Sequence, residues 1–225
     1  MYTKDPNLGL AIHKLLVDKQ VESPFFFNAF SPESFALIEQ KIKELLEIIG
    51  MDLSNASVSK TPKRTTKFFI QELFYGLDYN NFPKMTTNPN DYNYRRPLFS
   101  QAIYFNSTCE HHLVSITGYA YIAYIPKDKV IGLSKLNRVV DFFAKRPQMQ
   151  ERVTRQIFYA LREILSTEDI AVGIVAKHHC IAIRGVRDDS TKNITVEFGG
   201  QFNSDGQLQA AIYNMMNTKV TVNEY

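Results

Sequence analysis

Both cysteines of this 225-residue chain stand beside a pair of histidines, and this arrangement constrains the fold more than any other feature. The two groups are Cys109-Glu110-His111-His112 and His178-His179-Cys180, and they contain four of the five histidines. Thiolate and imidazole are ligands that suit zinc, and three such ligands leave a fourth position for water, as in catalytic zinc sites. The spacing therefore predicts a metal site shared by two distant segments.

Two buried thiols without a common role, or a single disulfide, are the alternatives to a metal site. A disulfide is typical of oxidising compartments. Residues 1–5 lack the apolar core of a signal peptide, however, and no apolar run approaches membrane-spanning length. We therefore expect a cytoplasmic protein that does not interact with a membrane. A zinc site of the purine-deaminase type is excluded because the chain lacks its Pro-Cys-x-x-Cys element.

The composition sets the size of the core and argues against one class of partner. With 44% hydrophobic residues, the chain can bury a core as one large domain or as a core plus an extension. The 26 basic and 23 acidic residues give a net charge of +3, and the basic residues form no run of five or six. Nucleic acid is therefore not an expected partner.

Helical patterns are the main signal in the first 80 residues, of which the first 30 are only weakly ordered by pattern. Ser31 has the features of an N-cap, because proline and an acidic residue follow it, and Gly50 ends the helix. A second helix is predicted from Thr61 to Gly76, and residues 10–17 predict a short one. We therefore expect residues 1–80 to form a helical N-terminal extension.

After residue 80 the pattern changes to β-rich segments interrupted by helices. Strands are predicted at 103–105, 119–125, 170–176, 180–183 and 193–198, and helices from Ser134, from Pro147 and over 208–216. This order predicts an α+β fold for residues 81–225, with an antiparallel sheet covered by helices on one face.

Several motifs, in order along the chain, make it resemble GTP cyclohydrolase I. Each motif alone is modest, but their order and spacing over roughly residues 31–217 are highly specific. They are residues 61–64 (Thr-Pro-Lys-Arg), 76–79 (Gly-Leu-Asp-Tyr), 107–112 (Ser-Thr-Cys-Glu-His-His), 132–138 (Gly-Leu-Ser-Lys-Leu-Asn-Arg), 146–152 (Arg-Pro-Gln-Met-Gln-Glu-Arg), 178–180 (His-His-Cys), 184–187 (Arg-Gly-Val-Arg) and 198–200 (Phe-Gly-Gly).

The resemblance implies a tunnelling fold, in which subunit sheets join around a central hole with helices outside. It also implies a homodecamer of two stacked pentameric rings with active sites at subunit interfaces. The implied reaction converts GTP and water to formate and 7,8-dihydroneopterin triphosphate, the first committed step towards folate and other pterins. The implied cofactor is Zn2+, which lowers the pKa of bound water towards ~7 and supplies hydroxide for attack at C8 of guanine.

The implied zinc ligands are Cys109, His112 and Cys180. The sequence alone does not distinguish His111 from His112 as the ligand, so this assignment rests on the resemblance. His178 matches the family's catalytic histidine and His111 matches a second histidine beside the metal. Both are suited to delivering protons to ring nitrogens.

The implied substrate contacts divide between the base and the triphosphate. Glu151 matches the carboxylate that accepts hydrogen bonds from guanine, and Gln150 beside it is expected to orient the base. Without the resemblance, Glu151 would be interpreted as a solvated acid at a helix start. The expected triphosphate contacts are Ser134, Lys135, Arg138 and Arg184, with Arg64 and Arg187 as weaker candidates.

Two other classes of protein were weighed against this hypothesis. A non-catalytic assembly protein with zinc as a staple between strands would need neither His178 nor Glu151, which the chain retains. A deazapurine reductase would need a nucleophilic thiol, and the chain has no cysteine outside the two metal groups. The remaining histidines, His13 and His179, have no expected role.

Overall fold

The computed structural model describes residues 2–26 and 30–218, and the expected α+β class is confirmed. The helices are α1 (Pro6–Asp18), α2 (Pro32–Ile48), α3 (Thr61–Lys67), α4 (Leu133–Ala144), α5 (Gln150–Leu165), α6 (His179–Ala182), α7 (Gln201–Ser204) and α8 (Gly206–Asn217). The π-helix η1 (Phe68–Leu73) and the 3-10 turns η2 (Tyr75–Leu77) and η3 (Tyr79–Asn81) follow α3. The strands are β1 (Thr87–Pro89), β2 (Leu98–Cys109), β3 (Ser115–Tyr124), β4 (Lys129–Ile131), β5 (Pro147–Gln148), β6 (Ile170–His178) and β7 (Asn193–Phe198).

The central sheet has five strands in the order β5-β2-β3-β6-β7, and β1 pairs with β4 in a separate two-stranded sheet that the sequence did not predict. Neighbouring strands of the central sheet are antiparallel except β5, which runs parallel to β2. The prediction of a helix from Pro147 is wrong at its start. Pro147 and Gln148 pair with Thr108 and Cys109 at the end of β2, so α5 begins only at Gln150.

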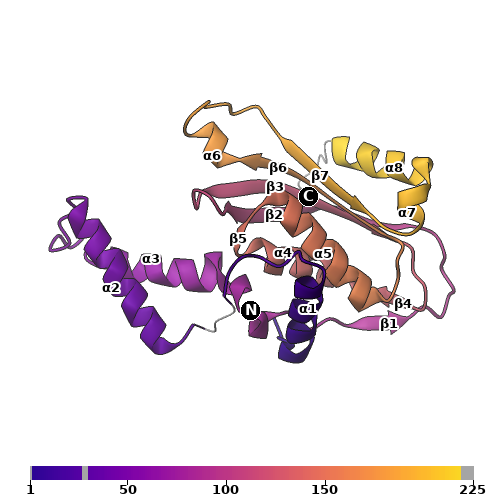
Figure 1. Cartoon of the computed structure of the whole chain (residues 1–225), viewed down its shortest axis with the longest axis horizontal. Helices are drawn as coiled ribbons and strands as arrows, with labels where there is room; N and C mark the ends of the chain where they lie inside the picture. Colours follow the sequence, from indigo (N-terminus) through magenta and orange to yellow (C-terminus); the bar gives the residue numbers. More distant parts are fainter. Residues whose placement is uncertain (1, 27–29, 219–225) are drawn as a thin grey trace, which may run out of the picture.

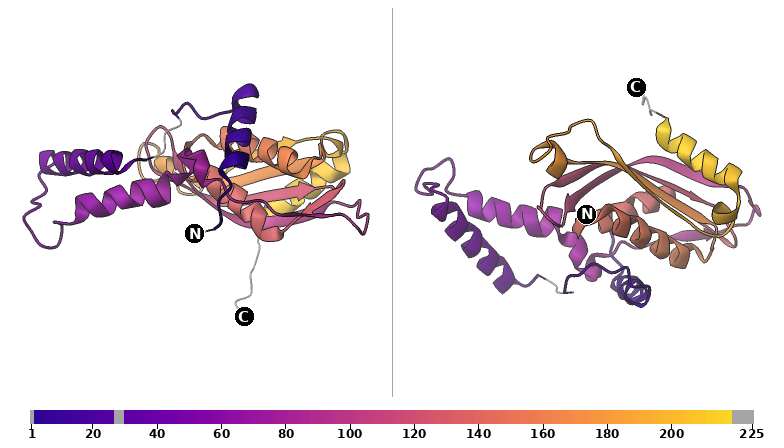
Figure 2. Two further views of the ribbon diagram at one scale, coloured as in Figure 1. Left: turned by 90° about the horizontal axis from the view of Figure 1, so that it is seen from below. Right: turned by 45° about the horizontal axis from the view of Figure 1, so that its top comes forward.

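Helices cover both faces of this sheet, so the prediction of helices on one face only is wrong (Figures 1 and 2). On β3, Ala120 and Ile122 face the main core beneath α4 and α5, whereas Tyr121 and Ala123 face a second cluster that includes Ile212 of α8. Successive side chains of a strand point to opposite faces. Because both sets on β3 are apolar, both faces of the sheet need cover.

The expected N-terminal extension contains two different parts. Helix α1 packs into the main core through Ile12 and Leu16, which are fully buried. Helices α2 and α3 project away from the sheet (Figure 1), and α2 has no buried residue. Leu45 and Ile48 of α2 are more than half exposed, so this helix presents apolar surface to its surroundings.

The predicted ends of the N-terminal helices are partly confirmed. Ser31 caps α2, because its hydroxyl accepts from the Ser34 N–H at 3.2 Å, and Gly50 follows the helix with φ +91°. The second helix does not continue regularly to Gly76. The Phe74 N–H donates to the Phe69 carbonyl at 2.8 Å, which is π-helical spacing, and the chain then tightens into 3-10 turns.

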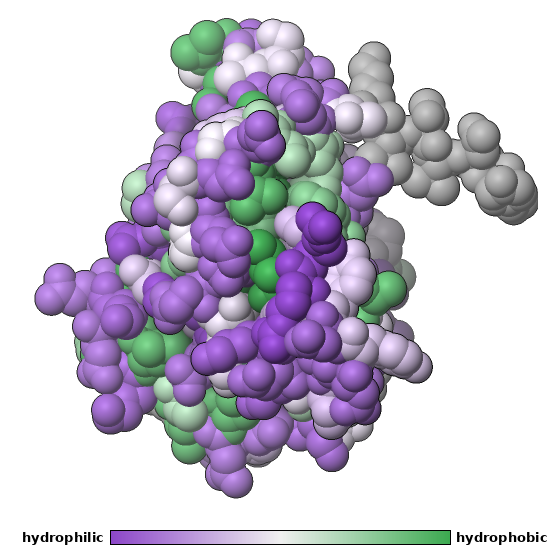
Figure 3. All heavy atoms as spheres, turned by 90° about the vertical axis from the view of Figure 1, so that its right-hand side faces the viewer, coloured by the Kyte–Doolittle hydropathy of each residue, from purple (hydrophilic) through white to green (hydrophobic). Residues whose placement is uncertain are grey.

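Polar side chains dominate the face of the molecule seen in Figure 3, where apolar side chains gather in a narrow strip and a few separate patches. Among the helices of the described chain, none is long and apolar enough to cross a membrane.

Candidate metal centre and active site

Cys109, His112 and Cys180 come together at one end of the sheet. One ligand atom from each, two Sγ atoms and a ring nitrogen, lie within 4.8 Å of one another. A tetrahedral zinc ion with Zn–S of about 2.3 Å and Zn–N of about 2.0 Å separates such atoms by roughly 3.5–4 Å. The donor set and its spacing therefore fit a single metal ion. Both cysteines of the chain are used here, so neither is left as a separate nucleophile.

The pairing of β3 explains why segments so far apart in sequence meet. Thr108 of β2 pairs with Ser115 on one side of β3, and His178 of β6 pairs with Ile116 on the other side. The end of β2 and the end of β6 therefore flank the same point of β3, and α6 lies beside the β2–β3 turn (Figure 1). The fold thus brings the two motifs, whose ligands His112 and Cys180 are 68 positions apart, to the same end of the sheet.

The first motif is held in a tight turn at the end of β2. The Cys109 N–H donates to the Val114 carbonyl and the Leu113 N–H donates to the Cys109 carbonyl, both at 2.8 Å. Leu113 takes a positive φ of +54°, which lets the chain reverse within four residues. This reversal turns His112 back towards Cys109.

The turn has a second support that the sequence analysis missed, the ion pair between Glu110 and Arg152 of α5. Two hydrogen bonds join the guanidinium to the carboxylate, one of them from Nη2 to Oε1 at 3.3 Å. The Glu110 N–H also donates to the Gln148 carbonyl at 3.1 Å. In the sequence, the only sign of this pair was that Glu110 lies inside the motif of residues 107–112 and Arg152 inside the motif of residues 146–152.

The second motif turns rather than extends, so the prediction of a strand over residues 180–183 is wrong. Pairing of β6 with β7 ends at Ala176, and residues 179–182 form the single helical turn α6. An extended strand would carry Cys180 away from the sheet edge, whereas the helical turn returns its Sγ towards Cys109. Burial and then the nearby Cys109 thiol raise the pKa of Cys180, and Arg184 opposes this shift.

His178 ends β6 beside this cluster and is half-buried. Burial lowers its pKa below the ordinary value, and the charge of Glu151 partly opposes the shift. Its Nε2 lies 2.8 Å from Oε1 of Gln150, which is almost completely buried. Glu151, by contrast, is exposed at the start of α5.

The other histidines occupy different surroundings. His111 is exposed, and its Nδ1 lies 3.8 Å from the Cys109 Sγ, so it sits beside the cluster without belonging to it. His179 forms a 2.9 Å hydrogen bond through Nε2 with the Thr117 hydroxyl. His13 packs against the Tyr79 ring at 4.7 Å between centroids, within the N-terminal part of the core.

The expected triphosphate residues do not all lie beside the metal cluster of their own chain. Ser134, Lys135 and Arg138 are in the first half of α4, whose other end leads to β5 and hence to Cys109. From Ser134 to the end of α4 the helix rises about 15 Å. Ser134 and Lys135 are therefore at the end of α4 away from Cys109, and Arg138 is about 9 Å of helix rise from its other end.

The remaining basic candidates lie on other elements. Arg184 is exposed just after α6 and therefore close to Cys180, while Arg64 is exposed on α3 and Arg187 is exposed in the segment before β7. The guanidinium of Arg138 lies 5.1 Å from the Tyr2 ring centroid, so the N-terminal segment contacts one of the expected substrate residues.

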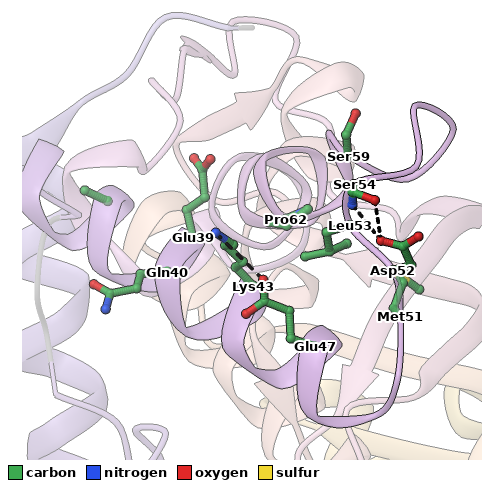
Figure 4. Close-up of a pocket in the computed structure, with 11 residues that line it drawn as sticks. Glu39, Gln40, Lys43, Glu47, Met51, Asp52, Leu53, Ser54, Ser59 and Pro62 are labelled. Carbon is green, nitrogen blue, oxygen red and sulfur yellow. Dashed lines mark hydrogen bonds and ion pairs between the residues drawn. The ribbon is translucent and has the colours of Figure 1, made fainter.

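The hollow between α2 and α3 is separate from these residues. Figure 4 shows the charged side chains that line it, among them Lys43, Glu47 and Asp52. Lys43 pairs with Glu47 at 3.8 Å, and Asp52 accepts from the Ser54 N–H at 3.0 Å. None of the residues that line it belongs to the metal cluster.

Comparison with known proteins identifies the family of this chain. The sequence matches the family model described as GTP cyclohydrolase I over residues 38–217. The chain belongs to the GTP cyclohydrolase I family. The matched range contains every residue of the metal cluster, His178 and the expected substrate contacts, so the resemblance inferred from the motifs is confirmed.

Curated relatives named GTP cyclohydrolase 1 match nearly the whole chain. One from Shewanella sp. (strain ANA-3) is 44% identical over 207 residues, covering 92% of this chain and 96% of the relative. Those from Shewanella oneidensis and Shewanella baltica (strain OS185) are each 44% identical over 203 residues, covering 90% of this chain and 94% of the relative.

A structural comparison is far weaker. The apo crystal structure of the archaeosine synthase QueF-Like aligns with a TM-score of 0.38 and 13% identity, covering 48% of this chain and 94% of that one. We draw no conclusion from it.

Proposed function

We propose that this protein converts GTP and water to formate and 7,8-dihydroneopterin triphosphate, the GTP cyclohydrolase I reaction. The observation that carries the proposal is the convergence of Cys109, His112 and Cys180 beside His178, in a chain that belongs to this family. A metal-binding scaffold alone would need the three ligands but no half-buried histidine next to them.

Zinc is the metal that we propose for the cluster. Two thiolates and one imidazole are a donor set typical of zinc, and three protein ligands leave one position open for a catalytic role. A bound zinc ion lowers the pKa of its water ligand towards about 7 and so supplies hydroxide at neutral pH. The Glu110–Arg152 ion pair fixes the turn that carries Cys109 and His112.

The side chains around the cluster then bind the base and move protons. Opening of the guanine imidazole ring and release of formate both require protons at ring nitrogens, and we assign this work to His178 with His111 as a second participant. Burial lowers the pKa of His178, which favours the neutral imidazole, the form that can first accept a proton and then donate it. Glu151, exposed beside His178, presents two acceptors to the N–H groups of the guanine.

The proposed triphosphate contacts come from more than one chain. We propose that Arg184 binds phosphate next to its own Cys180, whereas Ser134, Lys135 and Arg138 serve a site of a neighbouring copy, because they occupy the half of α4 that lies away from the Cys109 end of the helix. Arg64 is a further candidate for this anion.

Two exposed tyrosines support assembly through the sheet. Tyr104 and Tyr119 face each other across β2 and β3, and 63% and 47% of their surfaces are exposed in the single chain. Exposed aromatic surface on a sheet is typical of an interface. We propose that the sheets join in a tunnelling fold as a homodecamer of two pentameric rings, in the cytoplasm. Residues 1–80 would form the helical extension and residues 81–225 the catalytic domain.

An assay of GTP turnover by zinc-loaded protein tests the reaction. We expect formate and a fluorescent pterin product, with His178→Ala losing at least about 100-fold in rate, which is the lower range for a general acid–base group. His179→Ala is the matched control, since this neighbouring histidine bonds to Thr117, and it should retain activity. Bound zinc and GTP without formate release would refute the proposed reaction.

A further inference from the structure

Gln150 is buried between His178 and the sheet, although the sequence led us to expect it beside the substrate base. Only 2% of its surface is exposed. Its Nε2 lies 3.1 Å from three acceptors, the Ile174 and Asn193 carbonyl oxygens and the Thr195 hydroxyl. Its Oε1 lies 2.8 Å from the His178 Nε2. The amide is therefore saturated by groups of its own chain, which leaves no donor for a bound base.

These partners fix which way the amide points. The two ends of a glutamine amide look alike in most structures, and only the hydrogen-bond partners distinguish them. Carbonyl oxygens can only accept, so the atom that faces Ile174 and Asn193 must be the NH2 group. The oxygen of Gln150 therefore faces His178. If the amide oxygen and nitrogen exchanged places, the oxygen would face the carbonyl oxygens of Ile174 and Asn193 with no hydrogen between them.

The orientation of the amide determines the tautomer of the imidazole. An amide oxygen only accepts hydrogen bonds, so the His178 Nε2 at 2.8 Å must carry a hydrogen. A neutral imidazole has one N–H, and its other nitrogen is an acceptor. His178 in its neutral form is therefore the Nε2–H tautomer, with Nδ1 as the unprotonated nitrogen.

Two threonines hold the amide from behind. The Thr154 hydroxyl lies 2.8 Å from the Gln150 backbone carbonyl, to which it donates, and 2.7 Å from the Thr195 hydroxyl. Since the Thr154 hydrogen is already used, the Thr195 hydroxyl donates to Thr154 and accepts from Gln150. The hydrogen bonds thus form a continuous chain from β7 through α5 to the end of β6, in which the two hydrogens of the Gln150 NH2 group are shared among three acceptors.

We propose that Gln150 is a positioning residue that holds His178 in one orientation and in the Nε2–H tautomer, leaving Nδ1 as the nitrogen that exchanges protons during the reaction. This inference rests on the proposed function and deepens it. A proton that arrives at Nδ1 is the one that His178 can pass to a ring nitrogen of the substrate, while the Nε2 hydrogen stays bonded to Gln150. Support of this kind behind a reacting group is worth about 10- to 100-fold in activity.

The tautomer can be measured in the wild-type, zinc-loaded protein. Solid-state NMR of protein labelled with [15N]histidine has only five histidines to resolve, and the spectrum of His178→Ala assigns the signal. At about pH 8, where imidazoles are neutral, we expect the His178 Nε2 to be directly bonded to hydrogen and Nδ1 to be unprotonated. A hydrogen on Nδ1 would overturn the inference, and this test needs no substitution at Gln150.

Steady-state kinetics separate positioning from direct contact with the base. We expect Gln150→Met to lower kcat about 10- to 100-fold while the KM for GTP changes less than about threefold. In a His178→Ala background the same substitution should cost less than about twofold, because the residue acts through His178. A raised KM with kcat unchanged, or full additivity in the double variant, would overturn the inference.

Thr195→Val is the matched control for damage to the fold. It removes one acceptor of the Gln150 amide but leaves both carbonyl partners and the hydrogen bond to His178, so kcat should stay within about threefold of wild type. A loss in Thr195→Val as large as that in Gln150→Met would show that the network is only structural. Wild-type protein that releases no formate would refute the proposed function, whereas the tautomer measurement would still stand as a separate result.

Discussion

Replacing Arg146 with methionine tests how the N-terminal segment is held against the catalytic core. Arg146 is 1% exposed, and its guanidinium lies 4.9, 5.0 and 5.1 Å from the ring centroids of Tyr79, Phe142 and Phe143. Methionine is unbranched and fits an apolar ring cage, so the substitution removes the charge and the hydrogen bonds while keeping an apolar side chain among the rings.

The expected loss of stability in Arg146→Met depends on the polar groups that lose the guanidinium as a partner. The guanidinium donates to the Gly76 carbonyl, to the Tyr79 hydroxyl at 3.2 Å and to Glu22 Oε1 at 3.3 Å. Removing one partner of a buried ion pair costs about 3–5 kcal/mol. The Glu22 side chain is 15% exposed and keeps the hydrogen bonds from Tyr79 and the Ser23 N–H, so we expect the lower part of this range, about 3 kcal/mol.

The assay is urea unfolding of zinc-loaded protein at one fixed concentration, because assembly and bound metal both shift apparent stability. Arg155→Met is the matched control. Arg155 lies 3.9 Å from Glu197, and their side chains are 45% and 30% exposed. Arg155→Met should therefore lower the free energy of unfolding by less than about 1 kcal/mol. If Arg146→Met and Arg155→Met lowered the free energy of unfolding by the same amount, the argument that Arg146 anchors Glu22 and the N-terminal segment would be refuted.

Three further predictions concern the metal, the base and the tyrosines. Cys180→Ser should lose bound zinc, measured by mass spectrometry of metal content, and formate release with it; retention of both would contradict the ligand assignment. Glu151→Gln should raise the KM for GTP about 10- to 100-fold, because an amide offers guanine one acceptor and the carboxylate two, and an unchanged KM would refute this role. Burial raises the pKa values of Tyr2, Tyr75 and Tyr79. Since tyrosines of the unfolded chain ionise near pH 10, the contribution of these three residues to the free energy of unfolding should be constant below about pH 9 and fall above about pH 10. Above about pH 10 the free energy of unfolding should therefore fall less steeply in Tyr75→Phe than in the wild type; equal slopes would contradict this.

The sequence predicted best what local chemistry decides. Ser31 caps α2 because a hydroxyl at that position satisfies a free N–H of the first turn. The β-rich composition of residues 119–125 identified the strand β3, and both metal motifs were found from residue type alone. These features depend on neighbours within a few positions, so one sequence is enough to locate them.

The features that the sequence did not predict are decided by distant parts of the chain. Residues 180–183 looked like a strand, but pairing with β7 stops at Ala176 and the chain turns into α6. Residues 147–148 looked like a helix start, but they pair with the end of β2 and form a strand of the sheet. The face on which α8 packs depends on where the chain crosses the sheet edge, which no local pattern records.

The site shows the same division between local and distant causes. Spacing pointed to the two Cys/His groups but could not separate His111 from His112, and only the geometry puts the ring nitrogen of His112 within the cluster. Gln150 was placed beside the substrate from its position next to Glu151. The hydrogen bonds of its amide could not be predicted from that position, because the acceptors come from β6 and β7.

The most direct test of the central claim is the formate released per GTP consumed, measured before zinc removal, after removal and after zinc is restored. We predict about one formate per GTP from the zinc-loaded protein, loss of release with the metal and recovery on its return. Consumption of GTP without formate, or formate release that does not depend on zinc, would contradict the claim that Cys109, His112 and Cys180 hold the catalytic metal.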